Sequence, residues 1–253
     1  MREFLLKMFQ WEGGPEITLF SIWHIMYIVL IVGLTIGFAF IVKNKSEKVK
    51  KNVLNVLAVT AIAVYIADFF IMPLNGVGYG GYLDKLPFHI CTFISIMIPF
   101  AQFSKSNNKI AQSFKEIVAC LSIVASLMYM TYPGSAIGDI GTFSYKVVQT
   151  FVFHGLVFSW GFMSLATGSI SLKIKNIWKQ ALGILFIIGW ATLGNLSYGD
   201  YNWFFLVVPP FSFIPTQLTP LAIWVGVFAM CAIIYGIYYA VKAINNKIKA
   251  KKQ

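Results

Sequence analysis

The residues of this sequence that could do chemistry together are a cysteine, an aspartate and three histidines. The segment KLPFHICTF, residues 85–93, places His89 two positions before Cys91. A cysteine thiolate is a nucleophile that can take an acyl group, and a histidine can act as the base that deprotonates it. Two positions on a regular helix differ by about 200°, so His89 and Cys91 are expected to point to opposite sides. The base for Cys91 is therefore expected from another helix.

Three further residues are predicted to assist Cys91. A rise of about 1.5 Å per residue along the predicted helices puts His24, Asp68 and Cys91 roughly 8 to 9 Å from the same end, with His154 at roughly 12 Å. Either histidine could serve as the base, and Asp68 could orient the imidazole as in a catalytic triad. The predicted catalytic group is Cys91 with His24 or His154 and with Asp68.

Two asparagines and His89 are predicted binding residues. Asn195 or Asn202 could donate a hydrogen bond to an oxyanion. In a second interpretation no chemistry occurs, and a small polar or cationic ligand is bound or transported in a pocket lined by His24, Asp68, His89, His154 and Asn202. A third interpretation gives Asp68 only a structural role, as a hydrogen-bond partner of His24, Tyr65 or another span.

We expect no metal site and no cofactor. Cys91, Cys120 and Cys231 lie in three different apolar segments and form no CxxC pair, so neither zinc-site spacing nor a disulfide framework is present. Ligation of haem or a metal by the three histidines stays open as an alternative, because imidazole is a common ligand of both.

The elements that must position these residues are membrane-spanning helices. The chain of 253 residues is 58% hydrophobic and 11% charged, with a mean hydropathy of +0.74, which excludes an ordinary soluble domain. A span requires about 20 mostly apolar residues. The predicted fold class is all-α, a polytopic membrane protein with seven transmembrane helices over residues 19–42, 52–74, 86–103, 110–132, 143–167, 176–195 and 216–241.

The basic residues predict an orientation. All of the 20 lysines and arginines except Arg2, Lys7, Lys85 and Lys146 fall in the first, third and fifth connections, at the helix ends beside them, or in the C-terminal tail. Because basic loops stay on the cytoplasmic side, the N-terminus is expected outside and the C-terminus in the cytoplasm. The same topology explains the net charge of +11, so we expect no nucleic-acid partner.

The remaining segments complete one helical transmembrane domain over residues 1–253. Residues 1–18 form an amphipathic segment on the outer side. Residues 196–215 contain GDYNWFFLVVPPFSFIP, which is apolar but too short to cross, and Pro209 with Pro210 prevents a continuous helix. We expect this segment to be a re-entrant or interfacial lid over a polar pocket, because non-helical backbone at membrane depth requires such partners.

Four segments in the same order resemble the YwaF-like integral membrane proteins: LFSIWHIMYIV, KLPFHICTF, FVFHGLVFSWGFM and GDYNWFFLVVPP. The resemblance covers about residues 18 to 240, and its most specific part is the Leu-Pro-x-His-x-Cys pattern. A distantly similar eukaryotic branch includes a phospholipid acyltransferase thought to use a cysteine.

This resemblance implies a multi-pass protein of the cell membrane that acts on lipids. The expected activity is that of an acyltransferase or hydrolase using Cys91, with membrane lipids as partners and an acyl lipid or another small molecule as substrate. The oligomeric state is left open.

Overall fold

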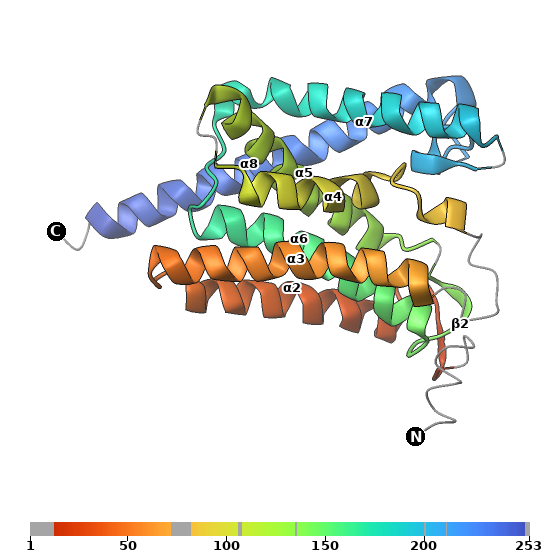
Figure 1. Cartoon of the computed structure of the whole chain (residues 1–253), viewed down its shortest axis with the longest axis horizontal. Helices are drawn as coiled ribbons and strands as arrows, with labels where there is room; N and C mark the ends of the chain where they lie inside the picture. Colours follow the sequence, from red (N-terminus) through yellow and green to blue (C-terminus); the bar gives the residue numbers. More distant parts are fainter. Residues whose placement is uncertain are drawn as a thin grey trace.

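The computed structural model describes residues 13–71, 82–105, 108–134, 136–199, 201–210 and 212–250. These residues form a bundle of helices (Figure 1). The long helices are α2 (Ile22–Val42), α3 (Glu47–Ile71), α4 (Ile90–Phe103), α5 (Lys109–Thr131), α6 (Tyr145–Ala166), α7 (Trp178–Ser197) and α8 (Thr219–Ala250). Short 3-10 turns are η2 (Tyr82–Lys85), η3 (Ile174–Asn176), η4 (Trp203–Phe205) and η5 (Thr216–Leu218). Two short strands, β1 (Glu16–Ile17) and β2 (Gly138–Gly141), pair antiparallel with Glu16 opposite Gly141.

The chain is an all-helical protein, and within the described residues six helices are long and apolar enough to cross a membrane. The exception among the long helices is α4, which has 14 residues. Side chains such as Val29 and Leu30 on α2 are 63% and 58% exposed, as expected of helices that face lipid rather than water. Residues 1–12 of the predicted amphipathic segment and residues 72–74 of the second predicted span lie outside the described residues.

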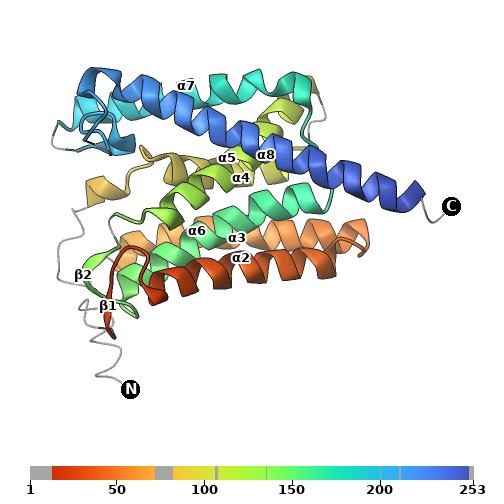
Figure 2. The same ribbon diagram turned by 180° about the vertical axis from the view of Figure 1, so that it is seen from behind.

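Helix α5 occupies the middle of the bundle. It packs against α4, α6, α7 and α8, while α6 also packs against α2 and α3. Figures 1 and 2 show α2, α3 and α6 on one side of the bundle and α7 with α8 on the other, with α4 and α5 between them. The core is correspondingly richest in residues of α5 and α6, such as Leu121 and Trp160, which are fully buried.

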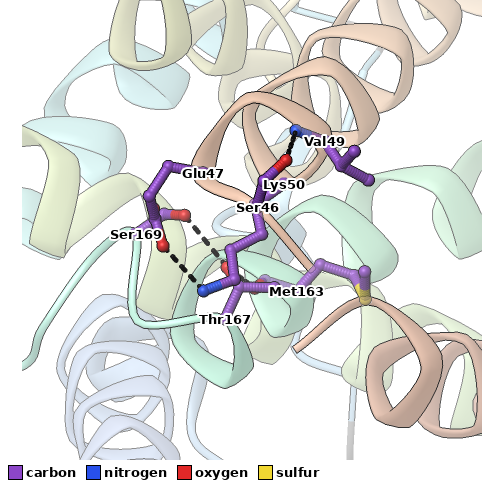
Figure 3. Close-up of polar contacts among 7 residues, drawn as sticks. All are labelled: Ser46, Glu47, Val49, Lys50, Met163, Thr167 and Ser169. Carbon is purple, nitrogen blue, oxygen red and sulfur yellow. Dashed lines mark hydrogen bonds and ion pairs between the residues drawn. The ribbon is translucent and has the colours of Figure 1, made fainter. Parts of the chain in front are cut away.

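The two ends of the bundle differ. The lid end carries the β1–β2 pair, the end of α3 and the α7–α8 connection, residues 198–218, which we call the lid (Figure 1). The basic end carries the α2–α3, α4–α5 and α6–α7 connections. At that end, Ser46 Oγ accepts a hydrogen bond from the Val49 N–H in the first turn of α3, and Thr167 Oγ1 donates to the Met163 carbonyl in the last turn of α6 (Figure 3).

The third predicted span is shorter than expected, because residues 86–89 are not part of α4. The Pro87 carbonyl accepts a hydrogen bond from Trp190 Nε1 on α7 at 2.8 Å, and the Phe88 N–H donates to the Leu86 carbonyl. These bonds replace the helical pattern, so α4 begins at Ile90 with His89 as its N-cap. Figure 1 shows that α4 begins short of the lid ends of α3 and α7. The first turn of α4 therefore lies inside the bundle.

Candidate functional site

Asp68 is buried and fully engaged. It lies in the last turn of α3 with 1% of its surface exposed. Lys85 Nζ forms an ion pair with Asp68 Oδ2 at 2.6 Å, and the Tyr145 hydroxyl at the start of α6 donates to Oδ1 at 3.0 Å. The Tyr65 hydroxyl donates to the Lys85 carbonyl, which fixes the lysine backbone beside α3. This network joins α3, α6 and the segment that leads into α4, and it satisfies both carboxylate oxygens.

Cys91 lies in the first turn of α4 and faces α5 rather than lipid. Its side chain is 6% exposed, and Sγ donates to the Ala125 carbonyl at 3.4 Å. Ala125 lies six residues, or about 9 Å, before α5 ends at Thr131. The N-cap, His89, makes no side-chain capping bond, and the first turn of α4 holds no acidic residue. The amides of this turn therefore keep the positive potential of a helix N-terminus close to the thiol.

His154 on α6 is held through one of its two ring nitrogens. It is 5% exposed, and its Nδ1–H donates to the Thr150 carbonyl at 2.7 Å. This bond fixes the tautomer, so Nε2 keeps its lone pair. Among the described residues, no group forms a hydrogen bond with Nε2. His89 and Lys85 lie close enough to interact electrostatically with the ring.

Helix α5 connects Cys91 to His154. The Tyr129 ring stacks on the His154 imidazole with centroids 3.9 Å apart and planes 4° apart. Tyr129 follows Ala125, the hydrogen-bond partner of Cys91, by four residues, which is one helical turn or about 6 Å along α5. The contact residue of the thiol, Ala125, and that of the imidazole, Tyr129, thus lie one turn apart on α5. Within the described residues Cys91 Sγ forms no hydrogen bond with an imidazole.

His24 is not placed as a free base. The Phe20 N–H donates to Nδ1 at 2.9 Å, so Nε2 carries the hydrogen and donates to the Met130 carbonyl at 2.7 Å. The ring packs against Phe151, and the side chain is fully buried. His24 therefore ties the start of α2 to the end of α5, and the structure does not link its ring nitrogens to Cys91 or Asp68.

His89 and Asn195 hold the lid. The Phe204 N–H lies 3.4 Å from His89 Nδ1, and the Asn195 side chain makes two bonds to Trp203: Oδ1 accepts from its N–H at 2.9 Å, and Nδ2 donates to its carbonyl at 3.0 Å. Phe204 and Phe205 have positive φ angles of 58° and 56°, which bulky residues rarely adopt. The turn η4 is thus fastened over the N-terminal end of α4.

The Asn202 side chain forms its hydrogen bonds with the backbone of the lid. Its Oδ1 accepts from the Val207 and Val208 N–H groups at 2.8 and 3.0 Å, and its Nδ2 donates to the Val208 carbonyl at 2.8 Å. These bonds close the loop that precedes Pro209. Both asparagines therefore have their side chains engaged by lid backbone.

The site is closed in this structure. Cys91, His154 and Asp68 are all at least nine-tenths buried. Two apolar grooves lie elsewhere: one of about 340 Å³ between α7 and α8, lined by Leu185, Ile188, Pro220, Leu221 and Trp224, and one of about 600 Å³ near the basic end of α4. Within the described ranges no group of three or more His, Cys, Asp or Glu side chains is close enough to hold a metal ion.

Sequence reasoning missed three members of this site. The sequence marks Lys85 only as a basic residue, whereas the structure makes it the ion-pair partner of Asp68. Tyr145 and Tyr129 are neutral residues at helix positions that no motif marks, although tyrosines near intramembrane carboxylates and imidazoles are natural partners. The position of Lys85 between two polar spans was the one available signal.

The sequence was compared with known families and proteins. The sequence model of the TMEM164 family matches residues 19–238, which include α2 to α7, the lid and most of α8. No curated protein and no solved structure matches.

Proposed function

Since this chain belongs to the TMEM164 family of membrane proteins, with a match over residues 19–238, we propose that it is a multi-pass membrane enzyme that transfers or hydrolyses lipid acyl groups through Cys91. His154 is the general base in this proposal. The observation that carries it is the arrangement along α5: the Cys91 thiol bonds at Ala125, and His154 stacks one turn away on Tyr129 with Nε2 unpartnered among the described residues.

The chemistry follows from these positions. In the proposed reaction the Cys91 side chain turns away from Ala125, its S–H proton passes to His154 Nε2, and the thiolate attacks the carbonyl carbon of an acyl ester. The tetrahedral intermediate collapses, the ester C–O bond breaks, and the leaving lysolipid alkoxide takes the proton from Nε2. An acceptor hydroxyl then attacks the thioester and regenerates the thiol; a lipid acceptor gives transfer, and water gives hydrolysis.

Two features support Cys91 as the nucleophile. The first turn of α4, whose N-cap His89 makes no side-chain capping bond, places the positive end of a helix beside the Cys91 thiol. The Thr150 carbonyl orients the imidazole as a carboxylate does in a triad, so the base needs no charged partner. Cys120 and Cys231 are buried in the core away from any described imidazole contact.

The alternative, a pocket that binds or transports a cationic ligand, has less support. Lys85 and Tyr145 already engage both oxygens of the Asp68 carboxylate. A cation would have to displace Lys85 from an ion pair that leaves only 2% of the Asp68 side chain exposed.

Intact-mass analysis of purified protein incubated with phosphatidylcholine tests the proposal. The wild type is expected to gain the mass of one acyl chain and to release lysophosphatidylcholine, while Cys91→Ser gains no thioester. Cys231→Ser is the matched control, because it removes a buried thiol outside the site and should acylate normally. Absence of both adduct and lipid turnover in the wild type would refute the enzyme assignment.

Variants of His154 and His24 distinguish the proposed catalytic base from a histidine that stabilises the fold. His154→Gln should lower the acylation rate by roughly 100-fold or more with the fold intact, because general base catalysis contributes about that factor. His24→Gln should lower thermal stability instead, because it disturbs the hydrogen bond from the His24 side chain to the Met130 carbonyl. The acylation rate per folded molecule should stay near that of the wild type. Equal loss of rate in both variants would contradict the assignment of His154.

A further inference from the structure

The lid contains a buried hydrogen-bond donor without an acceptor. Trp203 is fully buried, and among the described residues its Nε1–H has no partner. An indole nitrogen can only donate, and a buried donor left unpaired costs about 1–3 kcal/mol. A fold tolerates such a cost where another molecule supplies the acceptor.

Three other indoles, the buried one of Trp160 and the partly buried ones of Trp190 and Trp224, do have acceptors. Trp160 Nε1 donates to Gln102 Oε1 at 3.0 Å, Trp190 Nε1 to the Pro87 carbonyl at 2.8 Å, and Trp224 Nε1 to the Ala181 carbonyl at 3.1 Å. Each of these three bonds joins two different helices or segments. The backbone of Trp203 is instead held by the Asn195 side chain, so within the described residues no hydrogen bond of the indole N–H fastens the lid.

The indole lies over the N-terminal end of α4. Its ring packs against Phe88, the residue before the N-cap, with centroids 4.9 Å apart, and stacks on Tyr201 at 4.5 Å. The next residue, Phe204, directs its N–H to His89, the N-cap itself. The amides of the first turn of α4 and the indole N–H thus lie at the same end of the bundle, and both kinds of group favour an oxygen acceptor.

We propose that the Trp203 indole N–H binds an acceptor oxygen of a phospholipid, either an ester carbonyl or a phosphate oxygen, beneath the lid. The inference rests on the proposed action on lipids, and it adds a lid residue that recognises the lipid. An oxygen is the required atom because the free group is a donor. A phospholipid carries such oxygens in its glycerol esters and its phosphate, which lie in the interfacial region at either side of the hydrocarbon core.

The consequence for binding is a matched pair of variants. Trp203→Phe keeps an aromatic ring against Phe88 and Tyr201 but removes the N–H. It should therefore keep the unfolding temperature of the wild type while weakening phospholipid binding by about three- to tenfold. Trp190→Phe is the control, because it breaks the bond to the Pro87 carbonyl and should lower the unfolding temperature.

The decisive experiment follows the indole proton by NMR. The protein carries Cys91→Ser, so that no thioester can form, and its tryptophans are labelled with ¹⁵N. It is prepared in dodecyl maltoside. The peak of the Trp203 indole is assigned by its loss in Trp203→Phe. Dioleoyl phosphatidylcholine should move this peak downfield. The diether analogue, which has the phosphate but no ester carbonyl, should move it equally if the phosphate is the acceptor and not at all if the carbonyl is.

A Trp203 peak that responds to neither lipid, while the protein binds lipid by mass, would overturn the inference. Because this variant cannot form a thioester, that result is independent of the acylation test, and acylation of the wild type without a shift would leave the proposed function standing alone. If Trp203→Phe does not fold, each of the other tryptophans is replaced in turn, and the indole peak that none of these variants removes is that of Trp203. The response of this peak to the two lipids then tests the inference.

Discussion

At the scale of single residues, the site depends on how each polar side chain is satisfied. His24 has both ring nitrogens bonded to backbone, and Asp68 has both oxygens bonded to Lys85 and Tyr145. His154 alone of these has one nitrogen held and the other available among the described residues. This difference is the reason that His154 is the base in the proposed function, because a base needs a lone pair that no other hydrogen bond uses.

The Asp68–Lys85 pair gives a stability prediction. Asp68→Asn should destabilise the protein by about 3 kcal/mol, because removal of one partner leaves the other charge buried and unpaired. The Lys85 side chain is only 13% exposed, so water screens it little. Glu47→Gln is the control, since its ion pair with Lys50 is on the surface with the glutamate 84% exposed. Unfolding in detergent measures both, and equal effects would contradict a buried role.

At the scale of elements, the short helix α4 decides the position of the site. Its first turn lies inside the bundle because the Pro87 carbonyl accepts a hydrogen bond from Trp190 and helix α4 begins only at Ile90. The lid is then fastened on that end through Asn195 and His89. Non-helical backbone inside the bundle is stable because polar side chains of α7 and of the lid form hydrogen bonds with its N–H and carbonyl groups.

The α5–α6 contact gives a prediction about packing. A Cβ at Gly161 would lie 2.7 Å from the Ala119 carbonyl oxygen and 2.8 Å from the Ser122 Cβ. Gly161→Ala should therefore push α6 from α5 and cost roughly 1–3 kcal/mol. Gly37→Ala is the matched control, because no atom lies within 4 Å of its added Cβ. The comparison uses thermal unfolding, and an unchanged melting temperature for Gly161→Ala would mean that the helices do not pack this closely.

At the scale of the whole molecule, the bundle has a polar lid end and a basic opposite end. The ion pair, the histidines and the lid belong to the first, and the lysine-bearing connections and the last turns of α8 belong to the second. Lysines and arginines are retained on the cytoplasmic side during insertion. We therefore propose that the basic end faces the cytoplasm and that the site opens to the outer leaflet.

A pair of reporter fusions tests this orientation. Green fluorescent protein joined to the C-terminus should fluoresce in bacterial cells, because it folds in the cytoplasm, and alkaline phosphatase at the same place should be inactive. Alkaline phosphatase inserted after Tyr198, in the lid, should be active. The reverse pattern would place the lid end in the cytoplasm, and the Cys91 proposal would then require inner-leaflet lipids.

The sequence by itself predicted a chain of apolar helices long enough to cross a membrane and a break in the helical pattern before the last of them. Apolar length, proline positions and rise per residue are local properties that one chain reveals. Only the tertiary structure decided which polar groups meet: Lys85 with Asp68, Cys91 with Ala125, and His154 with Tyr129. Such partners depend on how each helix is rotated about its axis and on backbone bonds such as Trp190 to Pro87, and side chains far apart in sequence set both.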